Sequence, residues 1–128
     1  MTIIGIAIVE FRGQYLVGKR SENVVLPGMA EFPGGKCHRD ETAELAAVRE
    51  CAEETGLTVQ TVRLLERVTW SYSHGELDLH FWLCHPTSRN PEPQAPFRWI
   101  SPENLGDLNF PSANASIVRM LTSGAVPR

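Results

Sequence analysis

One helical segment constrains the fold of this chain more than any other part of its sequence. Residues 42–55 contain neither glycine nor proline, and Leu45, Val48 and Ala52 have the spacing of an apolar helical stripe. Gly56 follows at the position where a helix commonly ends. The sequence therefore predicts a helix over 42–55 that is buried through this stripe.

Segments rich in β-forming residues lie on both sides of this helix, and a closing helix is predicted over Ala113–Leu121 with Ser112 as its cap. A loop is predicted over Ser21–Gly35, which contains several glycines and prolines. The predicted strands are Ile3–Phe11, Gln14–Arg20, Leu57–Tyr72, Leu77–His85 and Phe97–Ser101. This order indicates an α/β fold with helices packed on a mixed β-sheet.

Size and composition exclude several classes of protein. The chain has 128 residues, of which 42% are hydrophobic and 21% charged, as expected for one globular domain over 1–128. A domain of this size buries roughly 65–70% of its unfolded surface, which excludes disorder and small disulfide scaffolds. Its 12 Lys and Arg residues against 15 Asp and Glu residues give a net charge of −3, so duplex nucleic acid is not expected as a partner.

The cysteines and the N-terminus bear on the cellular compartment. Cys37, Cys51 and Cys84 are widely spaced and form no CxxC pair, which favours three reduced thiols and a cytoplasmic location. The apolar run Ile3–Val9 ends at Glu10 and is too short for a signal or a membrane-spanning segment, so it is interpreted as a buried strand. No membrane partner is expected, and the sequence does not indicate an oligomeric state.

The predicted helix carries an acidic cluster. Glu50, Glu53 and Glu54 stand at i, i+3 and i+4, so their carboxylates project from one face and repel one another, by about 0.2–0.5 kcal/mol per pair on an open helix. Arg49 is placed to neutralise only part of this charge. Two interpretations follow from the residues alone: a solvated acidic face, or a site for a hard cation such as Mg²⁺, which prefers carboxylate oxygens.

The residues around this cluster form a longer pattern. Gly35, then Glu41, Arg49-Glu50, Glu53-Glu54 and Gly56-Leu57 occur at fixed intervals. Segment 35–57 thereby resembles the Nudix box, Gly-x5-Glu-x7-Arg-Glu-U-x-Glu-Glu-x-Gly-U, where U is aliphatic. Cys51 occupies an aliphatic position, a conservative change because free cysteine behaves as a small hydrophobe. His38 and Asp40 stand where members of the family commonly have Glu and Gly.

The resemblance implies a Nudix-type α/β/α sandwich with a mixed sheet, and a metal-dependent hydrolase of nucleoside diphosphates linked to another group. It implies Mg²⁺ as the cofactor, with Mn²⁺ as an alternative. By this likeness Glu53 and Glu54 are metal ligands, Glu50 is a ligand or the base that activates water, and Arg49 orients a glutamate. The Gly34 carbonyl would help to hold the metal, Glu41 would support the loop, and Glu92 is the candidate for a further acidic ligand.

The likeness extends to the MutT-like branch of the family through Lys19-Arg20, segment 31–36 and segment 110–114. In that branch Asn114 would bond to the purine edge, the Phe32 backbone would read the base, and Arg20 would hold the phosphate or sugar. Tyr72 would lie near the base. Leu79, Phe81 and Lys36 complete the candidate substrate-binding set.

The function that the sequence predicts is therefore hydrolysis of a nucleoside triphosphate to the monophosphate and pyrophosphate, with a preference for oxidised purines such as 8-oxo-dGTP. Such an enzyme would sanitise the nucleotide pool and support DNA repair. CTP or another nucleotide is the alternative substrate. A non-catalytic Nudix module is a further alternative, although such modules typically lack box glutamates, and an acidic interaction domain would leave the glycine loop unexplained.

Overall fold

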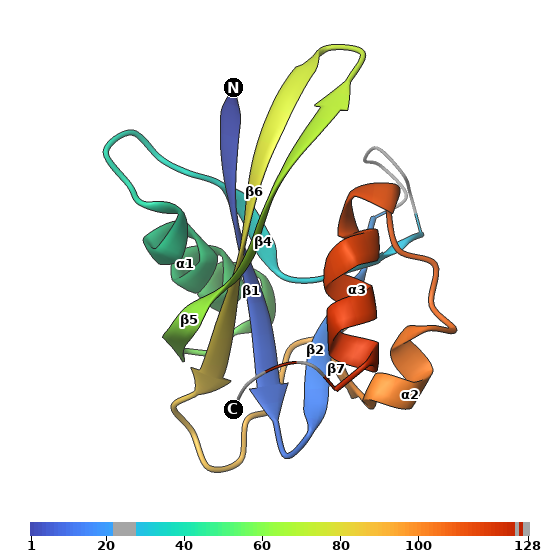
Figure 1. The fold of residues 1–128 in the computed structure, drawn as a ribbon. Coiled ribbons are helices and arrows are strands. Elements are labelled where there is room, and N and C mark those ends of the chain that lie inside the picture. Colours follow the sequence, from blue (N-terminus) through green and yellow to red (C-terminus); the bar gives the residue numbers. More distant parts are fainter. Residues whose placement is uncertain (22–27, 125, 127–128) are drawn as a thin grey trace.

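The fold was analysed in a computed structural model that describes residues 1–21, 28–124 and 126 (Figure 1). It contains seven strands, three α-helices and a short 3-10 helix in its described part. In chain order these are β1 (Thr2–Phe11), β2 (Gln14–Lys19), β3 (Ala30–Glu31), β4 (Gly34–Lys36), α1 (Ala43–Thr55), β5 (Val59–Tyr72), β6 (Gly75–Pro86), β7 (Arg98–Ile100), α2 (Pro102–Leu105), η1 (Ser112–Asn114) and α3 (Ala115–Thr122).

The strands form a mixed sheet in the order β3-β2-β1-β6-β5, with β4 paired to β1 and β7 paired to β2. The β1–β6 pair is parallel and extends from Thr2↔Leu77 to Val9↔Cys84. The other pairs are antiparallel, including the long β5–β6 hairpin. The predicted α/β fold with a mixed sheet is confirmed.

The two longer helices cover opposite faces of the sheet, α1 on one and α3 on the other (Figure 1). Side chains alternate between these faces along β1, as expected for a strand. Ala7 and Val9 belong to a buried cluster with Ala47 and Cys51 of α1. Alternate strand residues form a second cluster with α3, whose members include Ile6, Ile8, Leu79, Phe81, Ile117 and Leu121. The helices therefore enclose two separate cores.

The buried face of α1 differs from the prediction. Leu45 is 58% exposed and Ala52 is also exposed, whereas the buried positions are Ala43, Ala46, Ala47, Cys51 and Thr55. A Cβ atom on Gly5 of β1 would lie only 2.1 Å from the Ala43 carbonyl oxygen. The helix thus lies directly against the backbone of β1, and only small side chains fit between them. The predicted stripe was therefore wrong at Leu45 and Ala52, whereas Val48 is partly buried against the core as predicted.

Two further predictions need correction, and one helix was missed. The predicted loop over Ser21–Gly35 contains β3 and the start of β4, and its residues 22–27 lie outside the described residues. The closing helix begins with the 3-10 turn η1, so Asn114 rather than Ser112 precedes α3. Helix α2 was not predicted; it starts with Pro102 at a position where proline is well tolerated. The other strands agree with their predicted ranges to within three residues.

The cysteines are not paired in disulfides. Burial raises the pKa of the Cys51 thiol to about 11 and that of Cys84 to about 12. Both thiols are therefore protonated at neutral pH and unreactive, because the thiolate is the nucleophile. No helix in the described part of the chain is long and apolar enough to cross a membrane.

Candidate active site

The site is built where β4 meets α1. Thr42 caps the helix by accepting a hydrogen bond from the Leu45 amide at 3.1 Å. In the preceding turn Asp40 has a φ of 64°, in the left-handed region that favours glycine. This is the position at which members of the family commonly have glycine, and aspartate is among the residues that tolerate this conformation. The substitution therefore keeps the turn.

Arg49 binds the loop to the helix. Its guanidinium donates two hydrogen bonds to Glu41, at 2.8 and 2.9 Å, and one to the Lys36 carbonyl oxygen at 3.0 Å. Glu41 also accepts a hydrogen bond from the His38 amide. The hydrogen bonds from Arg49 and His38 hold the pKa of Glu41 at about 2. Glu41 therefore supports the loop and orients the arginine, as the resemblance implied.

The same guanidinium reaches two of the helix carboxylates. Its Nη1 atom lies 3.1 Å from Glu50 Oε1 and 3.0 Å from Glu53 Oε1. It does not bond to Glu54. Arg49 thus offsets part of the acidic cluster only, in agreement with the helical spacing of these residues.

Glu54 and Glu50 lie against the glycines of β4. The Gly34 amide donates a long hydrogen bond to Glu54 Oε1 at 3.4 Å, and a Cβ on Gly35 would lie 2.5 Å from the carboxyl carbon of Glu50. Burial and the neighbouring Glu50 raise the pKa of Glu54 to about 8. Glu50 and Glu54 are therefore held close together, and their negative charge is only partly compensated. They face Gly34 and Gly35 of β4, which have no side chains and so leave room for the carboxylates.

These carboxylates are the candidate metal ligands. Divalent cations such as Mg²⁺ bind through carboxylate oxygens, and a cation would relieve the repulsion that raises the pKa of Glu54. Within the described residues, no three Asp, Glu, His or Cys side chains are already arranged as a metal cluster. Glu53 is 55% exposed, and like Glu50 it is paired with Arg49.

Glu92 is placed apart from this group. It is exposed, in the loop that follows β6, and it lines a surface depression with Gly56, Leu57 and Thr58, just beyond the end of α1. No hydrogen bond or ion pair connects it with the helix carboxylates.

The candidate base-binding residues lie on the other face of the sheet, towards α3. Phe32 is buried and stacks on Phe110 with ring centroids 4.9 Å apart. Leu79 and Phe81 are buried in the core under α3, while Tyr72 is 45% exposed near the tip of the β5–β6 hairpin. Phe32, Leu79 and Phe81 therefore belong to one buried cluster, in which Phe81 is fully buried.

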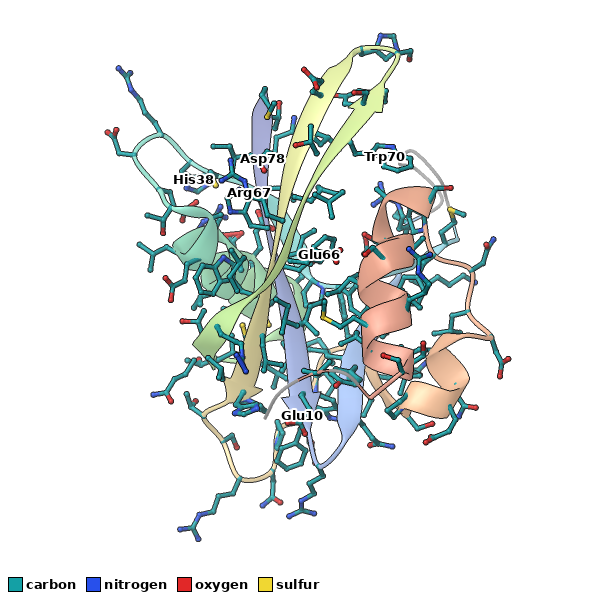
Figure 2. The ribbon with its side chains drawn as sticks, viewed as in Figure 1. Glu10, His38, Glu66, Arg67, Trp70 and Asp78 are labelled. Carbon is teal, nitrogen blue, oxygen red and sulfur yellow. The ribbon has the colours of Figure 1, made fainter. Side chains whose placement is uncertain are left out.

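Trp70 was missed by the sequence reasoning. It precedes Tyr72 by two residues on β5, so both side chains lie on the same face of the strand, and Trp70 is 39% exposed. It points towards the α3 side of the sheet (Figure 2). Because residues i and i+2 of a strand share a face, Trp70 could have been predicted from the assignment of Tyr72 to the base-binding set.

Asn114, Arg20 and Lys36 frame this region. Asn114 is half-buried at the start of α3, and its side chain makes no capping hydrogen bond to the helix. Arg20 follows β2 and lies 3.4 Å from Glu31, next to Phe32 in the chain. Lys36 ends β4 with an exposed side chain.

Comparison with known proteins identifies the family. Residues 5–120 match the model of the NUDIX domain family. The chain belongs to the Nudix family. It is 32% identical to the 8-oxo-dGTP diphosphatase of Escherichia coli (strain K12) over 110 residues, which are 84% of this chain and 85% of that protein. It is also 34% identical to the CTP pyrophosphohydrolase of the same organism over 114 residues, 87% of this chain and 82% of that protein.

Solved structures of Nudix proteins have the same fold. The E. coli ORF135 protein superposes with a TM-score of 0.78 at 30% identity, covering 99% of this chain and 94% of that one. The MutT protein of Methanosarcina mazei Go1 superposes with a TM-score of 0.79 at 21% identity, covering 98% and 96%. The predicted family and fold are confirmed, and this chain is a Nudix hydrolase.

Proposed function

We propose that this Nudix hydrolase cleaves nucleoside triphosphates to the monophosphate and pyrophosphate, with Mg²⁺ as its cofactor, and that it prefers oxidised purine nucleotides such as 8-oxo-dGTP. The observation that carries the proposal is the pair of crowded carboxylates, Glu50 and Glu54, held against the glycines of β4. The candidate base-binding residues lie on the α3 side of the sheet. The carboxylates suit a metal-bound phosphate chain, and the α3 side suits a nucleobase. We place the activity in the cytoplasm, in a single domain over 1–128.

The divalent ion would be held by Glu50, Glu53 and Glu54, and when bound it supplies positive charge that offsets the phosphate oxygens and lowers the pKa of water. Glu41 and Arg49 keep the loop and the helix in register through their paired hydrogen bonds. Glu50 is a ligand or the base that takes a proton from the attacking water. Either role requires the carboxylate to stay where Gly35 leaves room for it.

Substrate choice would be made on the α3 face. Trp70 and Tyr72 provide partly exposed aromatic surface for a nucleobase, which the Phe32 backbone would read. The Asn114 amide offers both a donor and an acceptor. Arg20 would hold the phosphate or sugar. The similarity to a CTP pyrophosphohydrolase favours a pyrimidine nucleotide as the second candidate. Rates measured on a panel of oxidised and normal nucleoside triphosphates would decide between the two.

Hydrolysis is expected to release pyrophosphate rather than orthophosphate. The MutT-like branch that the sequence resembles cuts between the α- and β-phosphates, and the relatives include a pyrophosphohydrolase. Phosphate and pyrophosphate assays identify the product, and reaction in ¹⁸O-labelled water shows which phosphorus is attacked. Label found in the monophosphate supports attack at the α-phosphorus. Orthophosphate as the first product would contradict the proposal.

Asn114→Ala is expected to reduce discrimination between bases. Loss of a side-chain hydrogen bond that leaves a buried partner unpaired costs about 1–3 kcal/mol, so kcat/KM for the preferred oxidised purine should fall roughly tenfold to a hundredfold. Rates on poor nucleotides should fall much less. Equal losses on every nucleotide would instead assign Asn114 a structural role at the start of α3.

A further inference from the structure

Glu66 is a carboxylate on the face of the sheet that carries the candidate base-binding residues. It lies on β5 and pairs across the hairpin with Phe81, and Val68 beyond it pairs with Leu79. Both partners belong to the core under α3. Paired residues in an antiparallel sheet share a face, so Glu66 points towards α3. Figure 2 shows Glu66 on this side and Arg67 on the opposite side, beside Asp78.

The two oxygens of this carboxylate have different surroundings. The Ser116 hydroxyl of α3 donates a hydrogen bond to Glu66 Oε2 at 2.7 Å. The other oxygen, Oε1, is buried and has no hydrogen-bond partner among the described residues. A buried acceptor without a partner costs free energy, and the cost is larger for a charged group. Such an atom in a native structure requires an explanation, and a ligand that brings an N–H donor is one.

The hydrogen bond from Ser116 to Oε2 places the Glu66 carboxylate at the start of α3, close in the chain to Asn114. Ser116 follows Asn114 by two residues at the start of α3, and Ala113 packs against the same core cluster as Leu79 and Phe81. Helix α3 therefore begins against β5. The Glu66 carboxylate thus lies at the same end of α3 as Asn114, although the two residues come from elements far apart in the sequence.

We propose that Glu66 is a specificity-determining residue, whose unpaired oxygen accepts a hydrogen bond from the ring N–H of a guanine-type base. A carboxylate can only accept hydrogen bonds. Guanine and its oxidised forms present a ring N–H beside an amino group, so two donors face the carboxylate. Adenine and cytosine present an amino group beside a ring nitrogen with a lone pair, which repels it. The inference rests on the proposed nucleotide substrate and adds the base that is selected.

The test measures binding without chemistry. Wild-type protein, Glu66→Gln and the control Glu76→Gln are titrated with GMP, 8-oxo-dGMP and AMP by calorimetry in the presence of EDTA. Glu76 is exposed near the tip of the same hairpin, so its substitution removes the same charge away from the proposed contact. Glutamine keeps the shape of Glu66 and can still accept from Ser116, but it replaces the free acceptor by an NH₂ donor.

Wild type and Glu76→Gln are expected to bind both guanine monophosphates more tightly than AMP. Glu66→Gln should weaken binding of the guanine ligands by about tenfold or more, and binding of AMP much less. An unchanged ratio of GMP to AMP affinity, an equal loss for both, or no preference in the wild type would overturn the inference. If Glu66→Gln does not fold by circular dichroism, Glu66→Asp, which withdraws the carboxylate by one methylene, replaces it with the same expected result.

Triphosphate hydrolysis is measured separately, so the two proposals can fail independently. If the protein hydrolyses triphosphates and Glu66→Gln has the same base preference as the wild type, only the inference is overturned. Glu66-dependent binding of GMP by a protein that hydrolyses no triphosphate would overturn only the proposed function.

Discussion

Glu54→Gln is expected to lower kcat by at least about a hundredfold, and Glu53→Gln to have a comparable effect, because each removes a charged oxygen from the proposed metal site. Glutamine preserves the volume of the side chain, so the fold should persist. In the metal-free protein the melting temperature of Glu54→Gln should rise by a few degrees, since burial and Glu50 both oppose the charge on Glu54.

Steady-state rates over a range of Mg²⁺ concentrations, together with calorimetric binding of Mg²⁺, would measure this effect. Glu103→Gln is a suitable control, because Glu103 is an exposed residue of α2 outside the proposed site. Wild-type rates at low Mg²⁺ for the Glu53 and Glu54 variants would show that these carboxylates do not bind the metal.

Gly35→Ala is expected to have an effect of similar size without touching a charged residue. The added Cβ would lie 2.5 Å from the carboxyl carbon of Glu50, so the carboxylate must move. A displacement of a catalytic group by about 1 Å can cost about a hundredfold in rate. We therefore expect kcat to fall by about a hundredfold, with a smaller loss of stability because the flexible Glu50 side chain can turn away.

Gly106→Ala is the matched control, since a Cβ there meets no atom within 4 Å and the backbone is in the right-handed helical region. Its rate and melting temperature should remain close to those of the wild type. A Gly35→Ala variant with the wild-type rate would mean that the position of Glu50 does not matter, and its role as ligand or base would be rejected.

The amino-acid sequence alone was sufficient to predict the family, the mixed sheet and the helix that carries the acidic cluster. These features depend on local patterns: the helical spacing of Glu50, Glu53 and Glu54, the glycine that ends the helix, and the alternation of residues in strands. The link from Arg49 to Glu53 is also local, one turn of helix. Local periodicity determines such contacts before any tertiary packing is considered.

Only the tertiary structure decided which face of α1 is buried, and which residues from distant segments meet. Leu45 is exposed although it is apolar, because α1 lies so close to Gly5 that only alanine-sized residues fit between them. Glu66 and Ser116 are 50 positions apart and meet because the start of α3 lies beside β5. Spacing along the sequence does not specify the distance between packed layers, so the sheet and its two helices had to be assembled before these contacts could be identified.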